Sequence, residues 1–105
     1  MSLERIKKAL VHLGLSRIDS EIYIYIANKG PNKVVEIANV LNISTSTVYS
    51  KLKKLESEEL VTKDHAIYSA LPFEEALELL INRKKRETNN FQKNKKLLIN
   101  WKKEE

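Results

Sequence analysis

A four-residue stretch, Leu41-Asn42-Ile43-Ser44, constrains the fold more than any other part of the chain. Apolar residues recur every three to four positions before it, from about Lys33, and after it, to about Glu58, as they do in amphipathic helices. Asn tolerates the left-handed backbone that a tight turn needs, and Ser is a preferred helix N-cap. The stretch therefore predicts a short helix, a tight turn and a longer helix in direct succession.

The rest of the chain contains few residues that interrupt regular structure, with two Gly and two Pro among 105 residues. This scarcity favours long helices and short turns. One predicted helix carries Ile18, Ile22 and Ile26 on a single stripe, so we expect it at the centre of the core. The predicted elements are, in order, helices after Ser2 and after Ser16, the two helices around residue 42, strands at 60–63 and 66–70, and a long helix from Phe73 to about Lys103.

This order of elements is the plan of the winged helix-turn-helix fold. We therefore predict a mainly α protein with a small β-hairpin, in which a winged helix-turn-helix is followed by a long C-terminal dimerisation helix. The expected division is a DNA-binding domain at residues 1–72 and a coiled-coil-like helix at residues 73–105. A three-helix bundle with an unrelated hairpin would produce a similar pattern.

The helix after Ser44 has one apolar face and one polar face. At about 100° per residue, Val48, Leu52 and Leu55 form a buried stripe, and the opposite side has no carboxylate before Glu56. Such a face suits a phosphate-lined groove, because a carboxylate there would be repelled. The predicted DNA-binding residues are Ser44, Thr45, Ser46, Thr47, Tyr49, Ser50, Lys53 and Lys54, with Lys63 on the wing.

The same face predicts moderate rather than strict sequence discrimination. It carries no Arg, Asn or Gln, the side chains best suited to bidentate reading of guanine or adenine. Hydroxyl groups, Tyr49, Lys53, water and DNA shape would have to supply the specificity. The alternative interpretation is that Ser44 and Thr47 only cap the helix and that the other polar residues are solvated.

Composition narrows the class of protein further. Lys and Arg number 19 against 14 Asp and Glu, and a net charge of +5 favours a polyanionic partner. The absence of Cys excludes a disulfide scaffold and a thiol nucleophile, and His12 and His65 lack a carboxylate partner at motif spacing. We therefore predict no enzymatic activity, no metal and no cofactor. Without a signal peptide or an apolar run of about 18 residues, we expect a cytoplasmic, nucleoid-associated protein with no membrane contact.

The C-terminal helix has apolar residues at both ends of a seven-residue repeat and polar residues in its middle, as in a coiled coil with a weak centre. All core residues of the winged domain are expected before about residue 79. An exposed Trp would make a poor monomer surface, so we predict pairing with a second copy. Two alternatives are packing on its own domain and packing on the first helix of a partner. The basic run Arg83–Arg86 either reaches the DNA backbone or is solvated. The predicted dimerisation residues are Leu77, Leu80, Phe91, Leu98 and Trp101.

Short motifs follow one another in a fixed order between residues 10 and 72: Leu13-Gly14-Leu15-Ser16, Glu21-Ile22-Tyr23, Gly30-Pro31, Glu36-Ile37-Ala38, Ser46-Thr47-Val48-Tyr49 and Leu60-Val61. Together they resemble the TrmB-like winged helix domain, best known from archaeal transcriptional regulators; MarR-like and ArsR-like winged helices are near neighbours. The resemblance implies a regulator that binds double-stranded DNA, and the C-terminal helix predicts that it acts as a homodimer. The alternative is a winged-helix protein-interaction module in a larger transcription or chromosome complex.

The chain departs from the family's pattern at three positions and at its end. Lys33 stands where a Thr N-cap is frequent, which predicts a cap shifted to Asn32. Asn42 and Glu59 stand where Gly is frequent; Asn tolerates the left-handed conformation, whereas at Glu59 we expect a different backbone. Family members that sense sugars carry a C-terminal effector domain. Because this chain stops at Glu105, we expect no sugar sensing and assign no small-molecule effector.

Overall fold

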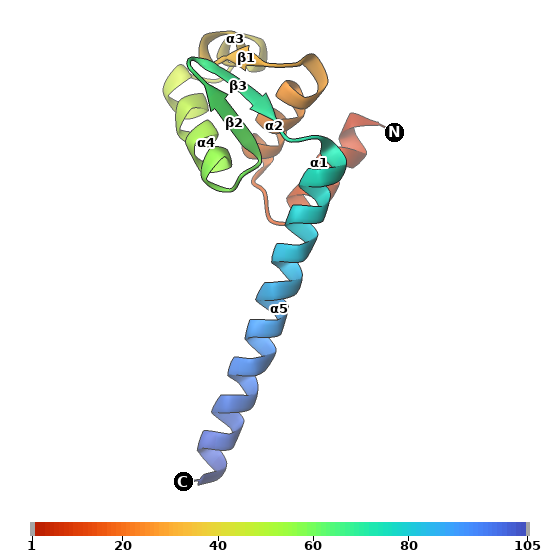
Figure 1. The fold of residues 1–105 in the computed structure, drawn as a ribbon, viewed down its shortest axis with the longest axis vertical. Helices are drawn as coiled ribbons and strands as arrows, with labels where there is room; N and C mark the ends of the chain where they lie inside the picture. The colour runs from red at the N-terminus through yellow and green to blue at the C-terminus, as the bar shows by residue number, and fades with distance from the viewer. Residues whose placement is uncertain (1, 105) are drawn as a thin grey trace.

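A computed structural model describes residues 2–104, with side chains through Trp101, and it confirms the predicted order of elements. Helices gather at one end of the molecule around a small sheet, and one long helix leaves this domain and continues alone (Figure 1). The elements are α1 (Leu3–His12), α2 (Arg17–Lys29), β1 (Asn32–Lys33), α3 (Val34–Leu41), α4 (Thr45–Ser57), β2 (Val61–Asp64), β3 (Ile67–Ala70) and α5 (Phe73–Glu104).

The sheet contains one strand more than the predicted hairpin. Strands β2 and β3 pair antiparallel, with Val61 opposite Ala70, and the two-residue strand β1 pairs with the other edge of β3. Strand β1 was not predicted because two residues carry no alternating pattern. It joins the helix-turn-helix unit directly to the wing, which fixes the position of the wing beside α3.

The core of the winged domain forms around α2. Ile22, Tyr23 and Ile26 are at most 1% exposed, whereas Ile18 is 37% exposed, so the predicted stripe is wrong at its first position. The Tyr23 hydroxyl donates a hydrogen bond to the carbonyl of Leu71, just after the hairpin. Burial raises the pKa of Tyr23 to about 12, with a smaller contribution from the charge of Glu75, so this hydroxyl remains a donor at physiological pH.

The turn before α4 has the backbone that the sequence predicted. Asn42 is left-handed, with φ 56° and ψ 46°, and the Ser44 hydroxyl accepts from the backbone N–H of Thr47 as the N-cap of α4. Glu59 also has a positive φ, of 67°, so the expected difference in backbone at this position is wrong. The N-cap of α3 is Lys33 rather than Asn32, and the Asn32 side chain accepts from the Lys33 N–H instead.

The first turns of α5 belong to the winged domain. Ala76 and Leu80 are 0% and 2% exposed in the core. Leu80, predicted as a dimerisation residue, is thus a core residue one position beyond the predicted end of the core at about residue 79. Arg83 fastens the next turn, because its guanidinium donates to the side-chain carboxylate and to the backbone carbonyl of Glu58, both at 3.1 Å. Glu58 is the C-cap of α4. The start of α5 is therefore fixed to the end of α4.

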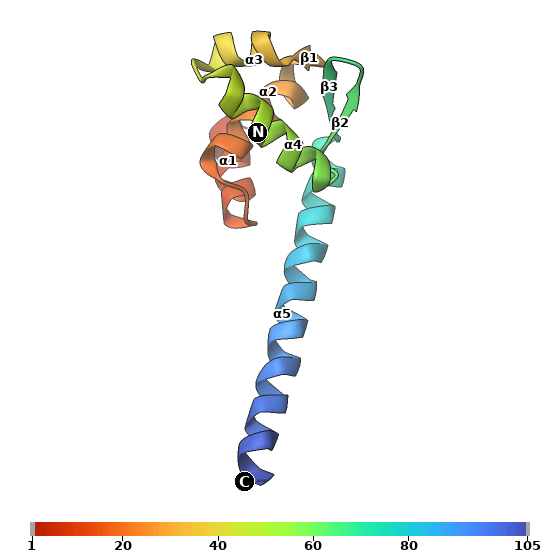
Figure 2. The same ribbon diagram turned by 90° about the vertical axis from the view of Figure 1, so that its left-hand side faces the viewer.

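Beyond Arg83, α5 projects away from the domain. Every side chain from residue 84 to residue 101 is exposed, and both ribbon views show the helix extending alone (Figure 2). The molecule measures 59 Å along its longest axis against 30 and 23 Å across. No helix within residues 2–104 combines the length and apolarity needed to cross a membrane. We call residues 84–104 the stalk.

Candidate nucleic-acid interface

Helix α4 presents the surface on which the DNA prediction depends. Val48, Leu52 and Leu55 are 0% exposed, which confirms the buried stripe that the sequence predicted. With this stripe in the core, the polar side of the helix is turned outward, where Ser46, Tyr49, Ser50 and Lys53 are exposed. The stripe thus fixes the rotation of α4 about its own axis.

The hydroxyl groups at the start of α4 divide into two sets. The Ser44 oxygen accepts from the Thr47 N–H at 3.2 Å and its hydroxyl donates to the Thr47 hydroxyl oxygen at 2.8 Å, so this pair is engaged in the helix cap. Thr45 and Ser46 lie between Ser44 and Thr47 in the first turn of α4 and are exposed. The Ser46 hydroxyl is within 3.3 Å of the Ser44 hydroxyl. Thr45 and Ser46, together with the N–H groups of the first turn, are therefore the better placed of these residues to receive a phosphate.

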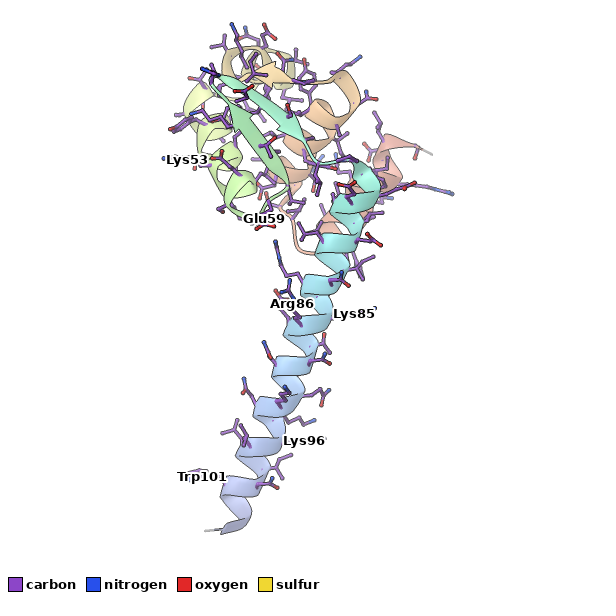
Figure 3. All side chains as sticks on the ribbon, in the orientation of Figure 1. Lys53, Glu59, Lys85, Arg86, Lys96 and Trp101 are labelled. Carbon is purple, nitrogen blue, oxygen red and sulfur yellow. The ribbon has the colours of Figure 1, made fainter. Side chains whose placement is uncertain are left out.

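The outward face also holds an aromatic residue and a cation in one unit. The Lys53 ammonium lies 5.2 Å from the centre of the Tyr49 ring, in the range of a cation–π interaction. Tyr49 is 42% exposed, and Lys53 projects outward from α4 (Figure 3). This contact preorganises one positive charge on the exposed face, about two turns beyond the hydroxyl groups of residues 44–47.

Lys54 makes no such contact with an aromatic ring on the exposed face and is paired with a buried carboxylate instead. Its ammonium lies 3.3 Å from the Asp19 carboxylate on α2, and Asp19 is 0% exposed whereas the Lys54 side chain is 50% exposed. The other Asp19 oxygen has no hydrogen-bond partner. Lys54 therefore compensates a buried charge, and the structure does not group it with Lys53 as a lysine directed at solvent.

This difference predicts unequal effects of two neighbouring substitutions on stability. Lys54→Ala leaves the buried Asp19 carboxylate without its cation, so the free energy of unfolding is expected to fall by about 1–3 kcal/mol. Lys53→Ala removes an exposed side chain, and its effect is expected to stay within about 0.5 kcal/mol. Urea unfolding of the two variants measures both values, and equal effects would contradict the role assigned to the Lys54–Asp19 pair.

The wing carries charges of both signs near its tip. The exposed Lys63 ammonium lies 5.8 Å from the centre of the buried Tyr68 ring. The carboxylate of Asp64 lies 2.8 Å from a ring nitrogen of His65, which has a positive φ of 58° in the turn. Lys63 is exposed, and the phosphate contact expected for it stays a prediction. The neighbouring Asp64 carboxylate limits the positive potential at this place.

Two residues that support this surface were not predicted to do so. Asp19 holds Lys54, and the bridge from Arg83 to Glu58 holds the C-terminal end of α4. An acidic residue in the first turn of a helix is a weak sequence signal for the first, because such residues are frequent there for other reasons. The Arg83–Glu58 bridge could not be recognised because Arg83 belongs to a basic run, Arg83–Arg86. The other three residues of this run are exposed. Among residues 2–104, no three His, Cys, Asp or Glu side chains gather as a metal site.

Sequence comparisons connect this geometry with known regulators. A family described as the sugar-specific transcriptional regulator TrmB matches residues 10–74. The HTH-type transcriptional activator ArnR of Sulfolobus acidocaldarius is 36% identical over 61 residues, which are 57% of this chain and 23% of ArnR. The HTH-type transcriptional regulator MJ0229 of Methanocaldococcus jannaschii is 44% identical over 41 residues, 39% of this chain and 43% of that protein. The matched segment is thus less than half of each relative.

Solved structures show the same fold. TrmBL2, an archaeal chromatin protein, superposes with a TM-score of 0.74 at 24% identity, over 93% of this chain and 41% of that chain. The transcriptional regulator Tm0710 of Thermotoga maritima superposes with a TM-score of 0.57 at 25% identity, over 93% of this chain and 79% of that chain. The family match covers the winged domain from the last residues of α1 to the start of α5, which is more than half of the chain. The chain therefore belongs to the TrmB family of winged helix-turn-helix transcriptional regulators.

Proposed function

We propose that the protein binds double-stranded DNA through the exposed face of α4 and acts as a transcriptional regulator in the form of a homodimer. The observation that carries the proposal is the rotation of α4, which buries Val48, Leu52 and Leu55 and turns a face without carboxylates outward. The related chromatin protein TrmBL2 is described as binding DNA, and ArnR as a transcriptional activator, which supports the same reading for this chain.

In this proposal α4 is the recognition helix in the major groove, because it is the second helix of the helix-turn-helix unit. Thr45, Ser46 and the first-turn N–H groups approach a phosphate, while Tyr49, Ser50 and Lys53 approach base edges and backbone. Lys63 on the wing adds a phosphate contact outside the groove. Small hydroxyl side chains let α4 approach the bases closely but read them less strictly than Arg or Asn would.

We propose a homodimer because one winged domain offers only a small surface to DNA. A single winged domain makes few contacts, and two domains held together bind more tightly because the second contact becomes intramolecular. The stalk, with exposed Phe91, Leu98 and Trp101, is the element that we propose holds the two copies. The favoured site would be an imperfect inverted repeat, with recognition helices about 34 Å apart or at a multiple of that spacing. A DNA-bound regulator of this kind would reside with the nucleoid.

Salt dependence tests the DNA interface. Binding to duplex DNA is expected to weaken steeply as salt rises, because phosphate contacts release counterions. Lys53→Ala is expected to reduce the slope of log K against log salt by about 1 per bound domain. Lys8→Ala on α1 removes the same charge from outside the α4 face and should leave the slope unchanged, and fluorescence anisotropy with a labelled duplex measures all three proteins.

No binding to duplex DNA at low salt would contradict the proposal and favour the alternative of a protein-interaction module. Equal slopes for the Lys53 and Lys8 variants would instead show that DNA binding does not use the α4 face.

A further inference from the structure

The stalk carries its charges unevenly around the helix axis. At about 100° per residue, Phe91 and Leu98 lie about 20° apart and define an apolar side. The single carboxylate of residues 84–101, that of Glu87, lies on this side, about 40° from Phe91. Four basic residues lie on the opposite side, about 120–160° from Phe91, and we call them the basic stripe: Lys85, Arg86, Lys93 and Lys96.

The cations of the basic stripe are available to a partner. Every side chain from residue 84 to residue 101 is exposed, and no carboxylate of the described residues forms an ion pair with any of the four. Arg83, earlier in the same basic run, is already paired with Glu58. Asn89 and Asn100 lie on the side of the basic stripe, and their amide groups can donate to phosphate oxygens beside the cations.

The distribution of acidic residues along α5 supports a role for the basic stripe. A solvated helix commonly mixes charges of both signs on one face, because opposite charges three or four residues apart stabilise it. On the side of the basic stripe the last carboxylate is that of Glu78, seven residues before Lys85 and outside the stalk. Lys93 and Lys96 are like charges three residues apart, so they repel each other unless an anion lies between them.

The basic stripe and the proposed recognition surface face in different directions. In Figure 3, Lys85 and Lys96 project from one side of α5, whereas Lys53 projects from α4 on the opposite side of the molecule. A duplex seated on the α4 face would therefore lie away from the basic stripe. Pairing of two stalks through Phe91 and Leu98 would also leave the basic stripe exposed.

We propose that the basic stripe binds the phosphate backbone of a second DNA duplex, so that the protein bridges two duplexes. Binding to the basic stripe does not depend on the proposed function. The bridge rests on it, because the α4 face is proposed to hold the first duplex. The attraction would be independent of sequence, since the four cations contact phosphates rather than bases.

Spacing along the basic stripe suits a duplex. Lys85 and Arg86 form one basic level, Lys93 and Lys96 form another, and the centres of the two levels lie about 14 Å apart along the helix axis. The major groove of DNA is about 12 Å wide. A stalk lying across this groove would therefore place one basic level against each of the two strands that border it.

Capture of one duplex by another tests the bridge. Full-length protein is bound to an immobilised duplex at low salt, and a labelled duplex of mixed sequence is then added. Replacing Lys85 and Lys96 together with Gln, which keeps a high helix propensity, is expected to lower the captured amount. The slope of log capture against log salt should fall by about 2, because each lost phosphate contact lowers it by about 0.9. Protein bound to the immobilised duplex should stay the same, since the α4 face is unchanged.

The matched control replaces Lys84 and Lys95 together with Gln. These lysines are also eleven residues apart, but they lie about 20–40° from Phe91, on the apolar side. The control loses the same charge and should keep the capture of the second duplex. Equal losses in both variants would show an effect of net charge alone. Full capture by both would show that the two α4 faces of one dimer hold the two duplexes. Either result overturns the inference.

A photo-cross-link separates this site from the proposed function. Because the chain contains no Cys, Asn89→Cys places a thiol-linked photoreactive group inside the basic stripe. Asn94→Cys places the same group about 60° from Phe91, on the apolar side. Irradiation with a labelled duplex is expected to cross-link the Asn89 variant to DNA and to give no such product with the Asn94 variant.

The outcomes of the cross-link distinguish the two proposals. If the Asn89 variant cross-links and Lys53→Ala leaves DNA binding unchanged, the basic stripe stands as a DNA site and the α4 interface fails. If DNA binding depends on Lys53 and the Asn89 variant gives no cross-link, the basic stripe alone is overturned. A cross-link without capture of a second duplex would show that the basic stripe and α4 hold one duplex, and would overturn the bridge.

Discussion

Replacing Leu98 and Trp101 together with serine is expected to lower the affinity for a duplex carrying two half-sites by about 10²–10⁴-fold. Both side chains are more than half exposed, at 65% and 58%, so their removal leaves the fold of the winged domain intact. What the substitution removes is the apolar contact between stalks, and with it the effective concentration of the second domain. Affinity for a duplex with one half-site should remain unchanged, because the α4 face is untouched.

Sedimentation of the free protein and titration of both duplexes measure this prediction. A matched control is the double variant Lys96→Ser and Asn100→Ser, which changes two exposed polar residues of the same stalk segment. It should keep the dimer. An unchanged affinity of the Leu98 and Trp101 variant for the duplex with two half-sites would show that the stalk does not hold the two domains together.

Leu80→Ala is expected to lower the free energy of unfolding by about 2–5 kcal/mol, the usual cost of truncating a buried leucine. Leu80 is 2% exposed and packs in the core of the winged domain, although the sequence pattern had placed it with the dimerisation residues. Asn82→Ala, at an exposed position two residues later on α5, should change stability by no more than about 0.5 kcal/mol. Chemical unfolding of both variants gives the comparison.

Protein concentration separates a core residue from an interface residue. The destabilisation by Leu80→Ala should be the same at low and high protein concentration, because the lost contacts lie within one chain. An interface residue behaves differently, since dimerisation stabilises the folded state by mass action. If the loss of stability caused by Leu80→Ala depended strongly on protein concentration, Leu80 would be an interface residue, and its assignment to the core would be contradicted.

Much of the winged domain could be predicted from local signals. Asn42 at the turn, Ser44 as an N-cap, and the stripe of Val48, Leu52 and Leu55 each follow from a short run of neighbouring residues. The sequence did not indicate β1, because two residues carry no periodicity. The expectation for Glu59 was wrong because it rested on residue type, whereas the turn after α4, closed by a hydrogen bond from the Leu60 N–H to the Leu55 carbonyl, has Glu59 in the left-handed conformation.

The exposed face of the candidate site could be predicted from the sequence, but the ion pairs between distant residues could not. Tyr49, Ser50 and Lys53 lie on the exposed face that helical periodicity gave them. Lys54 could not be separated from Lys53 in this way, because its partner Asp19 lies 35 residues earlier in the chain. Arg83 was grouped with its basic neighbours for the same reason, since its partner Glu58 lies 25 residues before it on another helix.

The bridge from Arg83 to Glu58 fixes the direction in which α5 leaves the winged domain. The helix that would read DNA and the helix that would pair with a second copy are thus joined at one point, so the direction of α5 would decide how the two recognition helices of a dimer are placed relative to each other. Substitutions at this joint would therefore change the operator spacing, while every residue proposed to touch DNA stays the same.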